Sequence, residues 1–333
     1  MKTDRLLFYD ILKAYAIFLV ILGHVIQTFN PEWKTDNVLL GIYMFHMPLF
    51  IAISGFFFVK SAEKNMLGSL IKKRFVGIML PSLTMGALDV LSIGGVKILK
   101  HESVDVLYFI DILFTGLWFL TVLFILTVIG IVLYKKLKGL WFYIGWLVVW
   151  LFFYILPDVW VFNQIEFLLP FYVFGIIGRN VKWEKLNVGI SVFALIGYCA
   201  CFTLFTFEDT MYSMGDECFS LIYIGKTSLR LACGILGILC SLAFIGCLTK
   251  FSYRVSKVAA IGVMTLPIYV LHQKFLIANK VMHLYTSNYI LMVLIAFILI
   301  LITIGMYMIL HRNKYLALLL FGELQSKKKS NGK

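Results

Sequence analysis

The sequence predicts an all-α fold, a polytopic transmembrane helical bundle of about ten helices. Hydrophobic residues make up 61% of the 333 residues and charged residues only 14%, whereas a soluble domain is nearer half apolar and a quarter charged. Runs such as 11–26 and 289–310 are nearly free of charge and long enough to cross a hydrocarbon core of about 30 Å as helices. Because spanning segments must satisfy their own backbone hydrogen bonds, and the alternating pattern of an outer-membrane barrel is absent from the sequence, helices are expected.

Ten apolar segments set the expected order of the helices. They lie at 8–29, 38–59, 75–97, 114–134, 140–156, 164–178, 187–207, 227–248, 258–276 and 289–310. The first follows basic residues as a signal peptide does, but it is too long and lacks a small-residue cleavage site, so a retained first helix is expected. We therefore expect a transmembrane domain over residues 1–312 and a short basic cytoplasmic tail over residues 313–333.

The basic residues are distributed unevenly between the two sides of the predicted bundle. Most of the 30 Lys and Arg residues fall in segments on the same side as the N-terminus, such as 72–74, 135–138 and 250–257. Cytoplasmic loops carry such an excess, so both termini are expected in the cytoplasm. The net charge of +13 then reflects topology and contact with membrane lipids, and no nucleic-acid partner is expected.

Three ionisable side chains lie in or near the first predicted span, where a charge costs about 2.5–3.5 kcal/mol on insertion scales. At 100° per residue, Lys13 and His24 point in directions about 20° apart and are separated by roughly 16 Å along the helix. Asp10 lies on the same side. These residues are candidates for the lining of one conduit, with Lys13 nearer the cytoplasm. Two simpler interpretations remain open: Asp10 and Lys13 as an i,i+3 ion pair, and His24 as a hydrogen-bonded interior histidine.

Further polar residues in the later spans are candidates for substrate contact or for supporting the site. They are His46, Ser54, Trp118, Glu166 and His272. A structural hydrogen bond is the alternative for His46, and an interfacial anchor is the alternative for Trp118. Gly55 is expected to let another helix approach closely. The basic run 72–74 fits either simple control of topology or a phosphate clamp.

Taken in chain order, these residues resemble the membrane acyltransferase-3 family, the bacterial integral-membrane O-acyltransferases that act on cell-surface sugars. The resemblance is carried by the segments 10–24, 45–58, 73–81, 117–120 and 265–272. The family pattern has an arginine, ten residues and then a histidine; here Lys13 takes the arginine position before His24. Lysine keeps the charge but loses the planar fork for bidentate binding. Gly77 stands where the family's second cytoplasmic arginine would fall.

The resemblance implies an acyltransferase that moves an acetyl group from cytoplasmic acetyl-CoA to a hydroxyl of a cell-surface polysaccharide or lipid-linked sugar. It implies His24 and Lys13 as catalytic residues, with His24 as the general base. It implies that Lys72, Lys73 and Arg74 receive the CoA phosphates, and that no metal takes part. The expected location is the bacterial cytoplasmic (inner) membrane.

Two other functions are compatible with the same residues. A transporter or flippase for a small solute or lipid-linked sugar would also use intramembrane charge and helix-breaking Pro and Gly. A haem protein would need axial histidines on facing helices, a role open to His24, His46 and His272.

Overall fold

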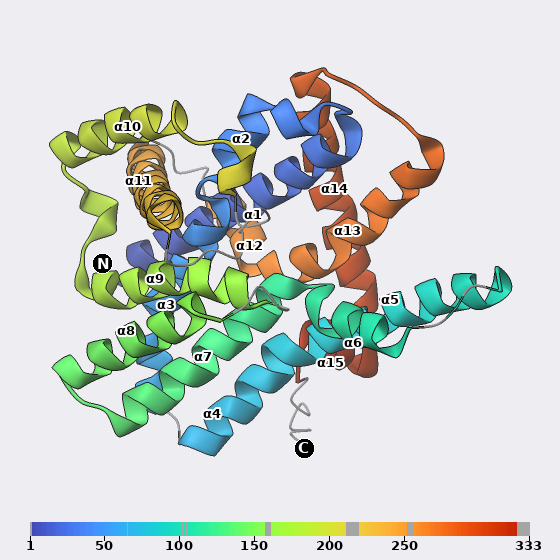
Figure 1. Ribbon diagram of the computed structural model, residues 1–333, viewed down its shortest axis with the longest axis horizontal. Helices are drawn as coiled ribbons and strands as arrows, with labels where there is room; N and C mark the ends of the chain where they lie inside the picture. Colours follow the sequence, from blue (N-terminus) through green and yellow to red (C-terminus); the bar gives the residue numbers. More distant parts are fainter. Residues whose placement is uncertain are drawn as a thin grey trace, which may run out of the picture.

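The described part of the chain is helical. The computed structural model describes residues 2–64, 66–101, 103, 105–156, 161–210, 220–251 and 256–324. Within these ranges it contains α-helices, one π-helical segment and short 3-10 turns, and no β-strand. The prediction of an all-α bundle is confirmed (Figure 1).

The helices of the first half are α1 (Lys2–Phe29), α2 (Asn37–Tyr43), α3 (His46–Lys64), α4 (Leu67–Arg74), the π-helical segment η2 (Phe75–Met79), α5 (Leu80–Leu99), α6 (Val106–Thr115), α7 (Trp118–Lys136) and α8 (Leu140–Tyr154). Those of the second half are α9 (Phe162–Ile177), α10 (Val188–Phe202), α11 (Leu221–Phe251), α12 (Ser256–Val263), α13 (Thr265–Met282), α14 (Tyr289–Leu310) and α15 (Lys314–Phe321).

Helical segments lie at all ten predicted positions. Among the described residues, six helical segments are long and apolar enough to cross a membrane, and the bent pair α12–α13 would make a seventh. The helices α8, α9 and α10 have 15 or 16 residues, fewer than the roughly 20 that a span needs. The chain is therefore a polytopic membrane protein in which some predicted spans are short.

The first helix runs through the middle of the bundle, where α12, α13 and α14 pack against it (Figure 1). This arrangement follows from the sequence of α1, whose side chains from Phe8 to Ile26 are mostly buried. A helix that is apolar on nearly every side has to be surrounded by other helices or lipid. Within this stretch, the polar side chains of Lys13 and His24 have protein neighbours, Phe57 and His272.

Glycines fix the crossing of α3 and α9. A Cβ atom on Gly55 would lie 2.1 Å from the carbonyl oxygen of Tyr172, and one on Gly175 would lie 2.0 Å from that of Ala52. Only glycine allows two helix backbones to come this close. The close approach predicted for Gly55 is confirmed, and it sets Tyr172 beside α3.

Several helices are interrupted near the centre of the bundle. The helices α12 and α13 meet at a bend of 77°, and α2 and α3 are separated at Met44 and Phe45. The π-helical turn η2 lies between α4 and α5. Irregular backbone at membrane depth is tolerated where it is buried in protein or lines a cavity.

The segment after residue 312 begins with a helix that packs on the bundle. Leu320 and Phe321 of α15 are buried, and α15 contacts α5 and α13. Glu323 accepts hydrogen bonds from Tyr307 (2.8 Å) and pairs with His311 (2.5 Å). The rest of the predicted tail, residues 325–333, lies outside the described residues.

Candidate functional site

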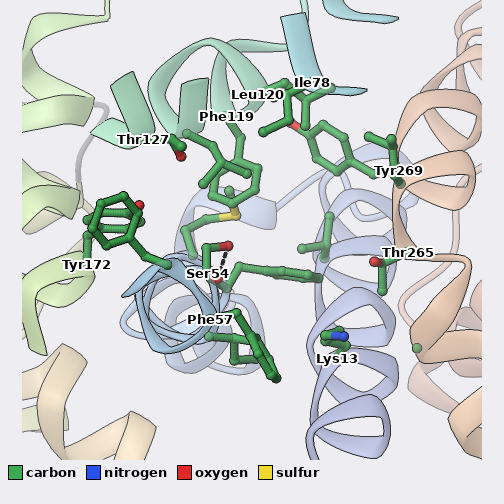
Figure 2. Close-up of a pocket in the computed structure, with 18 of the residues that line it drawn as sticks. Lys13, Ser54, Phe57, Ile78, Phe119, Leu120, Thr127, Tyr172, Thr265 and Tyr269 are labelled. Atoms are coloured by element: carbon green, nitrogen blue, oxygen red, sulfur yellow. Dashed lines mark hydrogen bonds between the residues drawn. The ribbon is translucent and has the colours of Figure 1, made fainter. Parts of the chain in front are cut away.

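A cavity of about 290 Å³ lies among the central helices, and α1, α3, α4, α7, α9, α12 and α13 contribute to its wall. In Figure 2, Lys13, Thr265 and Tyr269 lie on one side of this space and Tyr172 on the other, with Ser54 between them. The bend between α12 and α13 forms part of the wall, through Gly262 and Thr265. The interrupted helix thus shapes the cavity.

Lys13 is the cation on α1. Its ammonium group donates a hydrogen bond to the Asp10 carboxylate at 2.8 Å, and its Nζ atom lies 5.2 Å from the centre of the Phe57 ring. The i,i+3 pair considered for Asp10 is therefore formed. About a quarter of each of these two side chains is exposed.

Arg74, the last residue of α4, brings a second cation to the cavity wall. Its guanidinium donates to the Ser61 hydroxyl at 2.8 Å, and Ser61 lies one turn beyond Phe57 along α3. Lys72 and Lys73 are exposed and do not line the cavity. The basic run thus divides into one cavity residue and two surface residues.

Hydroxyl groups make up most of the remaining polar wall. Ser54 lines the cavity, and its hydroxyl donates to the carbonyl of Phe50 at 3.1 Å. Thr127, Tyr172 and Thr265 also line it. The sequence alone predicts no role for these last three, because an isolated hydroxyl in an apolar helix carries no spacing signal.

Three histidines, on α1, α3 and α13, lie near the cavity but do not line it. The rings of His24 and His272 are 5.2 Å apart between centroids. His46 is buried, its Nδ1 lies 2.8 Å from the carbonyl of Ile42, and its ring stacks on that of Tyr43. The structural hydrogen bond considered for His46 is therefore present.

Helix periodicity relates the cavity to these histidines. Val20 lines the cavity one turn before His24, and Tyr269 lines it one turn before His272. Residues three or four apart lie on the same face of a helix. The cavity wall therefore carries two cations, Lys13 and Arg74, and an imidazole pair lies within a helical turn of it.

Glu166 lies apart from this cavity. It is buried with Tyr223 and Arg230 in what we call the Glu166 cluster, where the Tyr223 hydroxyl donates to its carboxylate at 2.8 Å. Arg230 donates to the backbone carbonyl of Asp209 at 2.5 Å. A small space lined by Glu166 and Arg230 is separate from the large cavity. The contacts of Glu166 tie α9 to α11.

Trp118 lies next to the cavity without lining it. It begins α7, and its ring contacts that of Phe119, which does line the cavity, edge to face.

A comparison with known proteins identifies the family. A family model described as an acyltransferase domain, acyltransferase 3, matches residues 6–312. The chain belongs to this acyltransferase family. The family match contains α1 to α14 almost entirely, so the cavity and the histidine pair both lie within the acyltransferase domain.

Two curated relatives of this acyltransferase-family chain are rhizobial proteins named Nodulation protein NolL. The protein of Sinorhizobium fredii (strain NBRC 101917 / NGR234) is 36% identical over 91 residues, 26% of this chain and 25% of the relative. That of Mesorhizobium japonicum (strain LMG 29417 / CECT 9101 / MAFF 303099) is 36% identical over 86 residues, 24% of this chain and 23% of the relative. The chain thus matches about a quarter of the length of each. No solved structure matches the chain.

Proposed function

We propose that this protein transfers an acetyl group from cytoplasmic acetyl-CoA to a hydroxyl of a cell-surface polysaccharide or lipid-linked sugar. One observation carries the proposal: a cavity lined by Lys13 and Arg74 lies within a helical turn of the His24–His272 pair. Membership of an acyltransferase family supports the same reaction class.

The two cations of the cavity wall suit the donor. The cavity, about 290 Å³, is near the lower limit of ligand pockets, which run from about 300 to 1,000 Å³. It would hold the narrow thioester arm of acetyl-CoA and leave the nucleotide at the surface. Arg74 would receive a phosphate or carbonyl oxygen in the cavity mouth, and the exposed Lys72 and Lys73 would face the outer phosphates.

The histidine pair suits proton transfer. His24 would take the proton of the acceptor hydroxyl while its oxygen attacks the thioester carbonyl. The C–S bond then breaks, and the sulfur leaves as CoA thiol with the proton returned by His24. An imidazole is suited to both steps because its ordinary pKa is near neutrality. Donor and acceptor therefore react directly, with no acyl-enzyme.

The distribution of charge supports an orientation for this reaction. Basic residues concentrate on the side of the N-terminus, which favours both termini in the cytoplasm of a bacterial inner membrane. Lys13 and Arg74 then face the cytoplasmic donor, and His24 lies nearer the outer face. The sugar would enter from that face.

The direct test is His24→Ala in the purified full chain, reconstituted in lipid nanodiscs. Loss of a general base costs about 10²–10⁴ in rate, so CoA release with a lipid-linked sugar fraction as acceptor should fall by that factor. Acetyl-CoA affinity should not change, because Lys13 lies roughly 16 Å away along α1.

His101→Asn is the matched control, because His101 is exposed and its backbone has a φ of 56°, a conformation that asparagine tolerates. It should behave as the wild type. Wild-type turnover by a folded His24→Ala protein would refute the assignment of the base.

The bend of 77° between α12 and α13 favours the transporter as a second candidate, because discontinuous helices build many transport sites. A transporter would not release CoA from acetyl-CoA, so the turnover assay separates the two. A haem held between His24 and His272 is disfavoured, because rings 5.2 Å apart between centroids leave no space for a macrocycle between them.

A further inference from the structure

The hydrogen bonds of His272 determine which of its ring nitrogens carries a proton. The side chain is fully buried, and its Nδ1 lies 2.8 Å from the carbonyl oxygen of Tyr269 and 3.2 Å from that of Ile268. Carbonyl oxygens only accept hydrogen bonds, so Nδ1 must carry the hydrogen. In the neutral ring the lone pair is therefore on Nε2.

That Nε2 atom has no partner among the described residues, although it is buried. A buried polar atom without a partner is uncommon in folded proteins and calls for an explanation, such as strain, a functional role or a bound water. The neighbouring imidazole is that of His24. The two ring centroids are 5.2 Å apart, and the ring planes are inclined to each other by 39°. At this separation the ring edges are within reach of each other after a small rotation.

Contacts at the outer ends of the two helices hold the rings in register. The amide of Asn279 on α13 donates to the backbone carbonyl of Thr28 on α1 at 3.3 Å. The Thr28 hydroxyl in turn donates to the backbone carbonyl of His24 at 2.6 Å. Lys274, two residues after His272, pairs with Asp89 on α5. The helix that carries His272 is therefore fixed against both α1 and α5.

We propose that His272 is a positioning residue that fixes the tautomer of His24, an inference that rests on the proposed function. Its Nε2 accepts a hydrogen bond from one ring N–H of His24. The other ring nitrogen of His24 then keeps its lone pair. The Gln27 side chain, one turn further along α1, is a hydrogen-bond partner of His24, and the acceptor hydroxyl takes its place when the sugar binds. This role resembles that of the third residue in hydrolase triads, which holds the imidazole in the correct tautomer.

A neutral imidazole differs from a carboxylate in this position. It orients His24 but supplies no negative charge to stabilise the imidazolium that forms when His24 takes the hydroxyl proton. In the proposed reaction His24 holds this proton until it is returned to the leaving thiolate. His272 has no proton to donate to His24, because its Nε2 carries none and its Nδ1 hydrogen remains bound to backbone carbonyls.

Two variants test the proposal in the full-length protein in nanodiscs. His272→Leu fills the space without an acceptor, and His272→Gln offers an amide oxygen near the place of Nε2. Losing a partner that orients a metal-bound histidine costs about 10- to 100-fold in activity, and we expect a similar fall in kcat for His272→Leu. The KM for acetyl-CoA should stay unchanged, and His272→Gln should recover most of the rate.

A readout independent of activity is the ¹⁵N spectrum of labelled histidines, with the His24 signals assigned from His24→Ala. The wild type should show one tautomer of His24 and a coupling across the N–H···N bond to His272. His272→Leu should show a mixture of tautomers.

Three results would overturn the inference. The first is a wild-type kcat together with an unchanged His24 tautomer in His272→Leu. The second is failure of His272→Gln to recover the rate. The third is the absence of N–H···N coupling in the wild type, a measurement that does not depend on the folding of any variant. Absence of CoA release from the wild type would instead contradict the proposed function, and the coupling would still test the hydrogen bond.

Discussion

Replacing Gly262 by alanine tests whether the close contact between α12 and α1 shapes the donor end of the cavity. A Cβ atom at Gly262 would lie 1.7 Å from the carbonyl oxygen of Asp10 and 2.6 Å from its carbonyl carbon. These atoms belong to the backbone of a long helix and cannot rotate away, so α12 must move. Overpacking of this kind costs about 1–3 kcal/mol.

At about 2–4 °C per kcal/mol for larger domains, Tm should fall by roughly 2–12 °C. The KM for acetyl-CoA should rise as well, because Gly262 and Lys13 line the same cavity.

The assay is a thermal melt in nanodiscs, followed by donor titration at a temperature where both proteins are folded. Gly305→Ala is the matched control: it lies in α14, a Cβ atom there meets nothing within 4 Å, and alanine favours a helix over glycine by about 1 kcal/mol. It should melt at or above the wild-type temperature with an unchanged KM. If Gly262→Ala also melts at or above the wild-type temperature with an unchanged KM, the backbone contact between α12 and α1 and its connection to the donor site are refuted.

Arg74→Met should raise the KM for acetyl-CoA by about 10- to 100-fold, because a hydrogen bond to a charged group contributes about 1.5–3 kcal/mol. Lys73→Met, at an exposed position, should raise the KM less. Equal effects of the two substitutions would contradict the division of residues 72–74 into one cavity residue and two surface residues. Tyr223→Phe should lower Tm by several degrees without changing the KM for acetyl-CoA, because it leaves the Glu166 carboxylate without its hydroxyl donor. A changed KM would connect the Glu166 cluster to the cavity. In a cysteine-free background, a cysteine at position 208 should react with an impermeant maleimide added outside, and one at Lys182 should not. The opposite pattern would reverse the orientation.

The sequence predicted those parts of the fold that depend on local hydropathy and helix periodicity. Apolar runs located a helix at each of the ten positions, and a spacing of eleven residues predicted that Lys13 and His24 share one face of α1. Both follow from 3.6 residues per turn, which needs no knowledge of neighbouring helices. The helix α6 was not predicted because its ten residues are too short to stand out as a span.

Contacts between distant segments could not be predicted in this way. The basic run 72–74 has three adjacent cations, and only the register of α4 against α3 decides that Arg74 lines the cavity while its neighbours face out. Glu166 and Lys13 both cost free energy in a span, yet the crossing of α9 with α11 places Glu166 in a separate cluster. A charged residue in a predicted span thus indicates that the residue has a structural or functional role, but it does not indicate which site the residue belongs to.

The continuous helix α1 links the two ends of the proposed site. It runs without interruption from Lys2 to Phe29, so the distance from Lys13 to His24 is fixed by helical rise at roughly 16 Å. The helices opposite it are broken at Met264 and between α2 and α3, and these breaks open the space that α1 spans. A rigid α1 would hold the cation and the imidazole at a constant separation while the broken helices adapt to donor and acceptor. Donor binding at one end and proton transfer at the other are then separable, which is why substitutions at Arg74 and His24 are expected to change KM and kcat respectively.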